Sequence, residues 1–73
     1  RMFVDSVISI QSAGNIIVIK TLSGSANVAG EAIDSMRWPE VLGTLSGDNT
    51  IMVVVRDEAD AGLVVEKFHN ILR

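Results

Sequence analysis

The sequence predicts a small α+β domain: a two-layer sandwich in which a four-stranded antiparallel sheet carries two helices on one face, in the order ββαββα. Two pairs of apolar, β-branched segments are each joined by a short turn, which is typical of β-hairpins. Each pair is followed by a segment whose apolar residues recur at helical spacing. Because the chain has only 73 residues, these elements must share one core, and one sheet covered by both helices buries every apolar stripe.

The first hairpin is expected near the N-terminus. Residues 3–11 alternate in part, as in a strand with one buried face, and that face carries apolar side chains at Val4, Ile8 and Ile10. Residues 12–15 include glycine and asparagine, which favour a turn. Residues 16–22 then form a β-branched run that begins apolar on both faces, so the two segments should pair as antiparallel strands.

The first helix is expected to begin at Ala26. Ser23, Gly24 and Ser25 interrupt the preceding strand, and the two serine hydroxyls are suited to cap a helix. Apolar residues then recur at i, i+3, i+4 and i+7: Ala29, Ala32, Ile33 and Met36. A different face carries polar side chains: Asn27, Glu31 and Asp34. The helix should end before Pro39, because the residue that precedes a proline is disfavoured in the α region.

The second hairpin has a polar tip. The apolar runs 41–45 and 51–55 are joined by a segment that contains Gly47, Asp48 and Asn49. These residue types are suited to tight or positive-φ geometry, so the simplest interpretation is a turn and nothing more. The second interpretation is a ligand site, because backbone donors, one carboxylate and one amide together could hold a small zwitterion. Both interpretations remain open on these residues alone.

The second helix is expected after Asp57, which is suited to the N-cap position, with Asp60 in the N3 place. Its apolar stripe consists of Ala61, Val64, Val65, Phe68 and Leu72. His69 has no partner at metal-ligand spacing, so no metal or catalytic role is assigned to it. Trp38 is expected to anchor a core or an interface rather than to stack on a nucleic-acid base, since Arg37 is its only basic neighbour.

Two segments predict self-association. Residues 16–19 and 51–55 are apolar on both strand faces, whereas two helices cover only one side of a sheet. The uncovered side would be an unusually large apolar patch for a monomer. The sequence therefore predicts a homo-oligomer in which subunits cover each other's sheets.

Composition excludes several functional classes. The chain has no cysteine, which excludes disulfides and thiolate metal sites and is compatible with a reducing cytoplasm. Its net charge of −3 argues against binding to a phosphate backbone. No apolar stretch approaches the roughly 20 residues of a membrane-spanning helix, and no signal peptide is visible. Nucleophile–base sets, phosphate-binding loops and metal-ligand motifs lack sequence support, so no enzymatic activity is predicted.

Four segments follow a known pattern: residues 15–27, 32–35, 38–40 and, most specifically, 42–51, which read LGTLSGDNTI. They resemble bacterial arginine repressors, and the similarity runs from residue 5 to the C-terminus. The resemblance implies the carboxy-terminal domain, which binds L-arginine and assembles trimers into a hexamer. Residues 1–73 would be this single domain of a cytoplasmic regulator. The winged helix-turn-helix that contacts operator DNA would lie upstream, outside this chain, and L-arginine would be the co-repressor, with no other cofactor.

The resemblance also implies the residues that contact arginine. Asp34 matches the acidic residue on the first helix, Ser46 the small residue before the tip glycine, and Asp48 the first aspartate of a Gly-Asp-Asp turn. Asn27 stands where the family usually has glutamine or histidine. Asn49 stands where the second aspartate is expected, which removes one carboxylate per subunit. The implied site contains no catalytic residue and no metal ligand.

Two hypotheses from different classes follow. The first is an arginine-sensing, hexamer-forming domain, since a carboxylate matches a guanidinium with two parallel charge-assisted bonds and a helix start offers N–H groups to the α-carboxylate. The second is a constitutive assembly module with a weakened or lost arginine response, for which Asn49 is the observation. An enzyme of arginine metabolism is disfavoured, because the catalytic set is missing.

Overall fold

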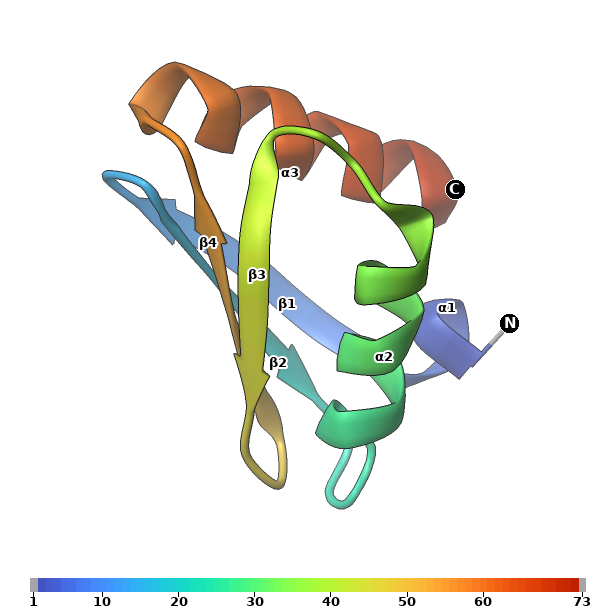
Figure 1. The fold of residues 1–73 in the computed structure, drawn as a ribbon. Coiled ribbons are helices and arrows are strands. Elements are labelled where there is room, and N and C mark those ends of the chain that lie inside the picture. The colour runs from blue at the N-terminus through green and yellow to red at the C-terminus, as the bar shows by residue number, and fades with distance from the viewer. Residues whose placement is uncertain (1, 73) are drawn as a thin grey trace.

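A computed structural model describes residues 2–72 of the chain (Figure 1). Along the chain the elements are α1 (Met2–Ser6), β1 (Val7–Ala13), β2 (Ile16–Thr21), α2 (Ala26–Met36), β3 (Val41–Ser46), β4 (Thr50–Val55) and α3 (Glu58–Leu72). The strands form one antiparallel sheet in the order β1-β2-β4-β3. The predicted α+β fold with the order ββαββα is therefore confirmed, and a short helix precedes it.

Helices α2 and α3 lie on one face of the sheet, and the core lies beneath them (Figure 1). The two central strands contribute fully buried aliphatic side chains to this core: Ile17, Ile19, Ile51, Val53 and Val55. The helices contribute Ile33, Val64 and Phe68 from their predicted stripes. Because full burial of such a side chain stabilises a fold by about 1.5–3 kcal/mol, these stripes decide how the two layers pack.

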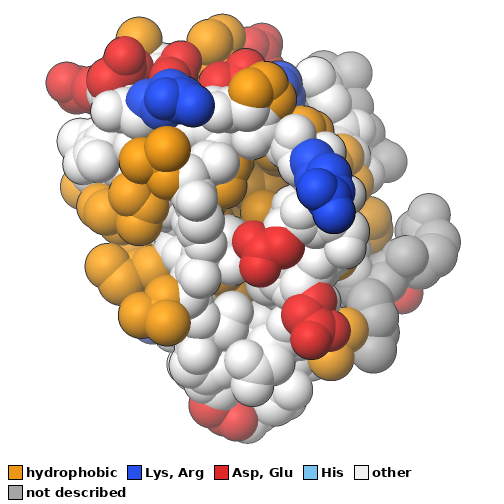
Figure 2. All heavy atoms as spheres, viewed as in Figure 1, with side chains coloured by type: hydrophobic (Ala, Val, Ile, Leu, Met, Phe, Trp, Pro, Cys, Tyr) orange, Lys and Arg blue, Asp and Glu red, His pale blue; other side chains and the backbone are white. Residues whose placement is uncertain are grey.

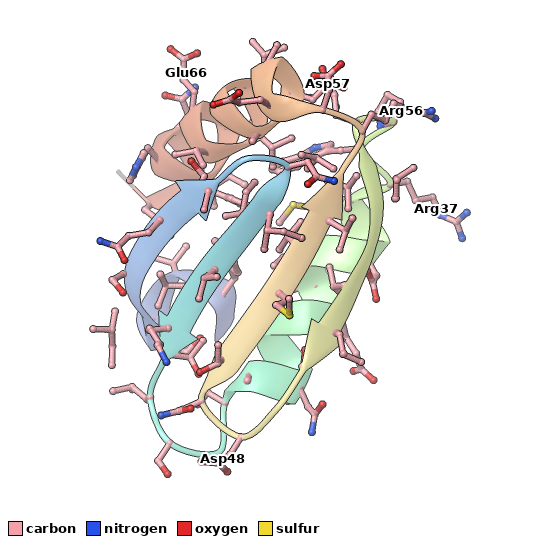
Figure 3. All side chains as sticks on the ribbon, turned by 90° about the vertical axis from the view of Figure 1, so that its left-hand side faces the viewer. Arg37, Asp48, Arg56, Asp57 and Glu66 are labelled. Atoms are coloured by element: carbon pink, nitrogen blue, oxygen red, sulfur yellow. The ribbon has the colours of Figure 1, made fainter. Side chains whose placement is uncertain are left out.

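The opposite face of the sheet carries apolar side chains that no helix covers (Figure 3). Ile16 pairs with Val54 and Val18 with Met52, and residues opposite each other on antiparallel strands project to the same side. Leu45 of β3 pairs with Met52 and is 73% exposed. We call these five residues the outer face. The central strands are thus apolar on both sides, as the sequence predicted.

The N-terminal segment differs from the sequence prediction, which extended the first strand back to residue 3. Residues 2–6 instead form the short helix α1. Phe3 and Ser6 are buried at the helical spacing i, i+3, and Ser6 Oγ donates a 3.3 Å hydrogen bond to the Phe3 carbonyl. The Phe3 ring also packs on Phe68 of α3, with centroids 5.4 Å apart. This tertiary contact favours a helical turn over a weak β alternation.

A β-bulge in β1 changes which of its side chains face the core. The register shifts just after Val7, so Ile8 is the extra residue. Val7 then pairs with Thr21 and Ile10 with Ile19, both on the core side, whereas Ile8 is 64% exposed. The alternation of residues 3–11 predicts that Ile8 and Ile10 share one buried face. That prediction was wrong, because one extra residue reverses the inward–outward alternation of a strand.

The helix termini confirm one predicted cap and correct another. Asp57 Oδ1 accepts a 2.9 Å hydrogen bond from the Asp60 N–H, so the predicted N-cap of α3 is confirmed. Ser25 occupies the N-cap position of α2 without a side-chain capping bond, so the predicted hydroxyl cap is wrong. Helix α2 ends at Met36, and its C-cap residue Arg37 has a φ of 52°, in the left-handed region. Glycine is the usual residue in that conformation.

An aromatic cluster of Phe3, Trp38 and Phe68 lies between α3 and the segment that leads into β3. The Trp38 and Phe68 ring centroids are 5.2 Å apart, which confirms Trp38 as an anchor of the core. Lys67 Nζ lies 5.1 Å from the centroid of the Trp38 ring and 3.0 Å from Glu40 Oε1. The hydrogen bond from Lys67, together with a backbone hydrogen bond, lowers the pKa of Glu40.

Candidate functional site

The tip of the β3–β4 hairpin lies beside the loop between β2 and α2, at one end of the sheet (Figure 1). Two backbone hydrogen bonds join them. The Thr21 N–H donates to the Asn49 carbonyl at 2.8 Å, and the Ala26 N–H donates to the Asp48 carbonyl at 3.1 Å. The first N–H of α2 is therefore satisfied by the hairpin tip, and the two loops form one surface.

The β2–α2 loop is a tight turn that brings Ser23 to the hairpin tip. The Ser25 N–H donates to the Leu22 carbonyl at 3.1 Å, and Gly24 has a φ of 80°, as in a type II turn. From this turn Ser23 Oγ donates a 3.1 Å hydrogen bond to Asp48 Oδ2. The sequence predicted a capping role for the Ser23 hydroxyl and did not predict this contact, because no local spacing links Ser23 to a residue on another hairpin.

The predicted ligand residues Asp48 and Asn49 are both exposed at the tip. Asp48 lies at the outermost point of the hairpin in Figure 3, at the end opposite Asp57 and Glu66. Asn49 Oδ1 accepts a 2.9 Å hydrogen bond from Thr50 Oγ1, which itself accepts a 3.0 Å bond from Lys20. The Asn49 amide oxygen is thus engaged, whereas its N–H₂ group has no partner among the described residues.

The two other predicted polar residues lie on α2. Asn27 and Asp34 are both exposed, and acidic side chains are visible over this helix in Figure 2. Asp34 Oδ1 accepts a 3.0 Å hydrogen bond from Thr44 Oγ1 on β3, which holds it against the sheet edge. Asn27 follows the residue whose N–H binds the Asp48 carbonyl, so it lies at the tip end of α2. Asp34 is two turns, or roughly 10 Å, farther along the helix axis.

Ser46, the fifth predicted residue, is half-buried between β3 and α2. A Cβ on Gly30 of α2 would collide with the Ser46 hydroxyl, so the glycine permits the helix to approach the strand closely. Ser46 therefore contributes to helix–strand packing. One chain brings Asn27, Asp48 and Asn49 to the same end of the sheet, and it does not bring Asp34 there.

The side chains at the hairpin-tip end of the sheet are suited to bind a cation. The exposed Asp48 carboxylate is flanked by amide and hydroxyl groups, and such a group binds a guanidinium or ammonium through charge-assisted hydrogen bonds. Within residues 2–72 no three His, Asp or Glu side chains are grouped so as to hold a metal ion. In the same range no helix is long and apolar enough to cross a membrane.

A family comparison defines the class of this domain. Residues 3–70 match the model described as the arginine repressor, C-terminal domain. The chain therefore belongs to this family, as the resemblance of its hairpin motif implied. The family is one of transcriptional regulators and not of enzymes, in agreement with the sequence analysis.

Particular relatives support the same assignment. The chain is 52% identical over 69 residues to the arginine repressor of Thermoanaerobacter sp. (strain X514), an alignment that covers 94% of the chain and 46% of the relative. It is 48% identical over 73 residues to the arginine repressor of Alkaliphilus metalliredigens (strain QYMF), with 100% and 49% covered. The repressor of Halalkalibacterium halodurans is 44% identical over 72 residues, with 99% and 48% covered. The chain spans about half the length of these curated relatives.

Proposed function

We propose that this chain is the effector-binding and oligomerisation domain of an arginine-dependent transcriptional regulator. L-Arginine binds between subunits and bridges two trimers into a hexamer, and this assembly promotes operator binding by the full-length protein. The observation that carries the proposal is the exposed Asp48 carboxylate, held at a polar hairpin tip in a domain of the arginine repressor family.

The ligand contacts follow from the chemistry of the side chains. The Asp48 carboxylate accepts hydrogen bonds from the cationic groups of arginine, and the Asn49 amide, which lacks a negative charge, adds donors. Asn27 and Asp34 contribute polar ligand contacts from α2. Ser46 supports the packing of β3 against this helix. Asp34 lies about two helical turns from the tip within one chain, and we assign the contacts that the tip of one chain does not supply to a second subunit.

The outer face provides a reason for assembly. Five apolar side chains from three neighbouring strands lie uncovered on one side of the sheet, and such a patch is stabilised by contact with another apolar surface. We assign this face to contacts within the trimer. Arginine at the hairpin tips then contributes to contacts between trimers, so that the ligand biases the assembly state through its higher affinity for the hexamer.

The rest of the regulator would lie outside this chain. The curated relatives are about twice as long, and we propose that an upstream winged helix-turn-helix contacts operator DNA in the cytoplasm. The present domain carries a net charge of −3, so it would act on DNA only through its effect on assembly.

The direct test is to titrate the purified protein with L-arginine while its mass is followed by sedimentation velocity. Arginine should convert trimers to hexamers and raise the melting temperature, since a ligand at 100 times its Kd stabilises the native state by about 2.7 kcal/mol. Citrulline, which lacks the charged guanidinium, should do much less. Equal responses to arginine and citrulline would mean that no carboxylate binds the guanidinium. A monomer at micromolar concentration would contradict the role proposed for the outer face.

A second candidate function for this domain is oligomerisation without an arginine response. Asn49 leaves the tip with one carboxylate where its family usually has two, which favours a constitutive oligomerisation module with a weakened or lost arginine response. The same titration decides between the two functions. A hexamer that forms at all arginine concentrations, without a heat of binding, would support the constitutive module.

A further inference from the structure

We propose that Ser23 is a positioning residue for arginine recognition: its hydroxyl fixes the orientation of the Asp48 carboxylate before the ligand binds. This inference rests on the proposed arginine-binding function and deepens it. Its basis is the 3.1 Å hydrogen bond from Ser23 Oγ to Asp48 Oδ2, which joins two exposed residues 25 positions apart in the sequence.

The backbone on both sides of Ser23 is tied to the hairpin tip. The Thr21 N–H binds the Asn49 carbonyl at 2.8 Å, and the Ala26 N–H binds the Asp48 carbonyl at 3.1 Å. The loop between these two anchors has little freedom to move away from the tip. Ser23 therefore lies opposite the Asp48 side chain as a consequence of the main-chain arrangement.

The turn itself fixes the direction of the Ser23 side chain. The bond from the Ser25 N–H to the Leu22 carbonyl closes a four-residue turn, and Gly24 supplies the positive φ that its third position requires. Ser23 occupies the second position of the turn, at which most residue types are tolerated. A serine there is consequently not needed for the backbone, and its hydroxyl is available for the contact with Asp48.

The hydrogen bond from Ser23 orients the Asp48 carboxylate and leaves most of its acceptor positions free. An ionised carboxylate offers about four acceptor positions on two oxygens, and the Ser23 hydroxyl uses one of them, on Oδ2. The remaining positions stay open to the parallel N–H groups of a guanidinium. An exposed aspartate without such a partner samples several rotamers and must lose that freedom on binding. Ser23 removes part of this entropic cost in advance, as a supporting hydrogen bond does at a preorganised site.

The test combines a double-mutant cycle with a conservative rescue, using isothermal titration of the purified protein with L-arginine. Ser23→Ala should weaken arginine binding about three- to tenfold, the range expected for one lost hydrogen bond, while Ser23→Thr should retain the parent affinity because it keeps the hydroxyl. In an Asp48→Ala background, Ser23→Ala should have no further effect on affinity. Ser12→Ala is the matched control, since Ser12 is an exposed serine next to the β1–β2 turn, and it should bind arginine as the parent does.

The outcomes separate this inference from the proposed function. Should the parent fail to bind arginine, the proposed function is wrong and the role of Ser23 falls with it. If the parent binds and Asp48→Ala weakens binding, but Ser23→Ala binds as tightly as the parent, only the role of Ser23 is overturned. An equal loss from Ser23→Ala in the presence and absence of Asp48 also overturns it, since the hydroxyl would then act by general stabilisation of the loop. Melting temperatures without arginine should differ by no more than about 4 °C between the Ser23 variants and the parent, which verifies that each variant folds.

Discussion

The two ends of strand β3 are held in different ways. The segment that leads into β3 is fixed by ring packing between Trp38 and Phe68, with Lys67 beside the indole. The segment that leaves β3 is fixed by hydrogen bonds between the hairpin tip and the β2–α2 loop, two from backbone groups and one from Ser23. We call these regions the aromatic end and the polar end.

The difference indicates a division of roles. Burial of an aromatic side chain removes a large apolar area from water and contributes several kcal/mol regardless of direction. An exposed hydrogen bond contributes only about 0.5–1.5 kcal/mol net, but it fixes direction. The aromatic end therefore supplies stability, and the polar end presents oriented groups that a ligand can contact. Five substitutions test this division, from the largest expected effect to the smallest.

Phe68→Ala should have the largest effect on stability. Phe68 is fully buried and packs on the rings of Phe3 and Trp38, so truncation should cost about 3–5 kcal/mol. That is a large share of the stability of a domain of this size, and thermal unfolding followed by circular dichroism should show a much lower melting temperature or no folded state. His69→Ala, at the exposed neighbouring position, is the control and should change stability by less than about 0.5 kcal/mol. A small loss for Phe68→Ala would refute the role assigned to the aromatic end.

Asp48→Asn should have the opposite pattern of effects, with a small change in stability and a large loss of arginine affinity. It keeps the size and turn preference of the side chain, so stability should change by only about 0.5 kcal/mol. It removes the negative charge that we propose as the contact for arginine. A charge-assisted bond contributes roughly 1.5–3 kcal/mol, so arginine affinity should fall by about ten- to more than a hundredfold. Isothermal titration measures this change. Undiminished binding would mean that the hairpin tip is only a turn.

Asn49→Asp provides the converse variant at the polar end. It restores a second carboxylate to the turn and should tighten arginine binding if that carboxylate also faces the ligand. Crowding of two negative charges should slightly destabilise the protein in the absence of arginine.

Arg37→Gly should stabilise the protein without changing arginine affinity. Arg37 is the only described non-glycine residue with a positive φ, and its side chain extends into solvent (Figure 3). The left-handed conformation costs an L-residue roughly 1–2 kcal/mol, part of which glycine loses again through its greater freedom when unfolded. A net gain of about 0.5–1 kcal/mol is expected, measured as a melting temperature several degrees higher. A decrease would show that the arginine side chain makes a compensating contact.

Glu40→Gln should give the smallest effect, and one that depends on pH. The pKa of Glu40 is lowered by Lys67 in the folded protein, so the pair stabilises the fold above the ordinary pKa of 4.5. This contribution is lost as the pH falls through the lower folded-state pKa. The parent should melt slightly above Glu40→Gln at pH 7, and this difference in melting temperature should shrink as the pH is lowered. Lys67→Met should lose the same pH dependence. A difference that stays constant with pH would assign the effect to packing instead of charge.

Sequence alone determined those features that depend on periodicity. The stripes of α2 and α3, the two-sided apolar strands, the Asp57 cap and the polar hairpin tip all follow from spacing within one element. The resemblance of residues 42–51 to a known family correctly indicated the class of protein. The position of Asp48 at the tip was predictable for the same reason, since a turn between two apolar runs defines its own apex.

Tertiary structure decided the features that join distant segments. Residues 2–6 are helical because Phe3 packs on Phe68, and Ile8 is exposed because a bulge shifts the pairing of β1 with β2. The contact between Ser23 and Asp48 exists because two backbone hydrogen bonds bring a loop to the tip of another hairpin. Such contacts depend on strand register and on packing between elements. Local secondary-structure propensities differ by only a fraction of a kcal/mol per residue, so the burial of a single aromatic ring outweighs them.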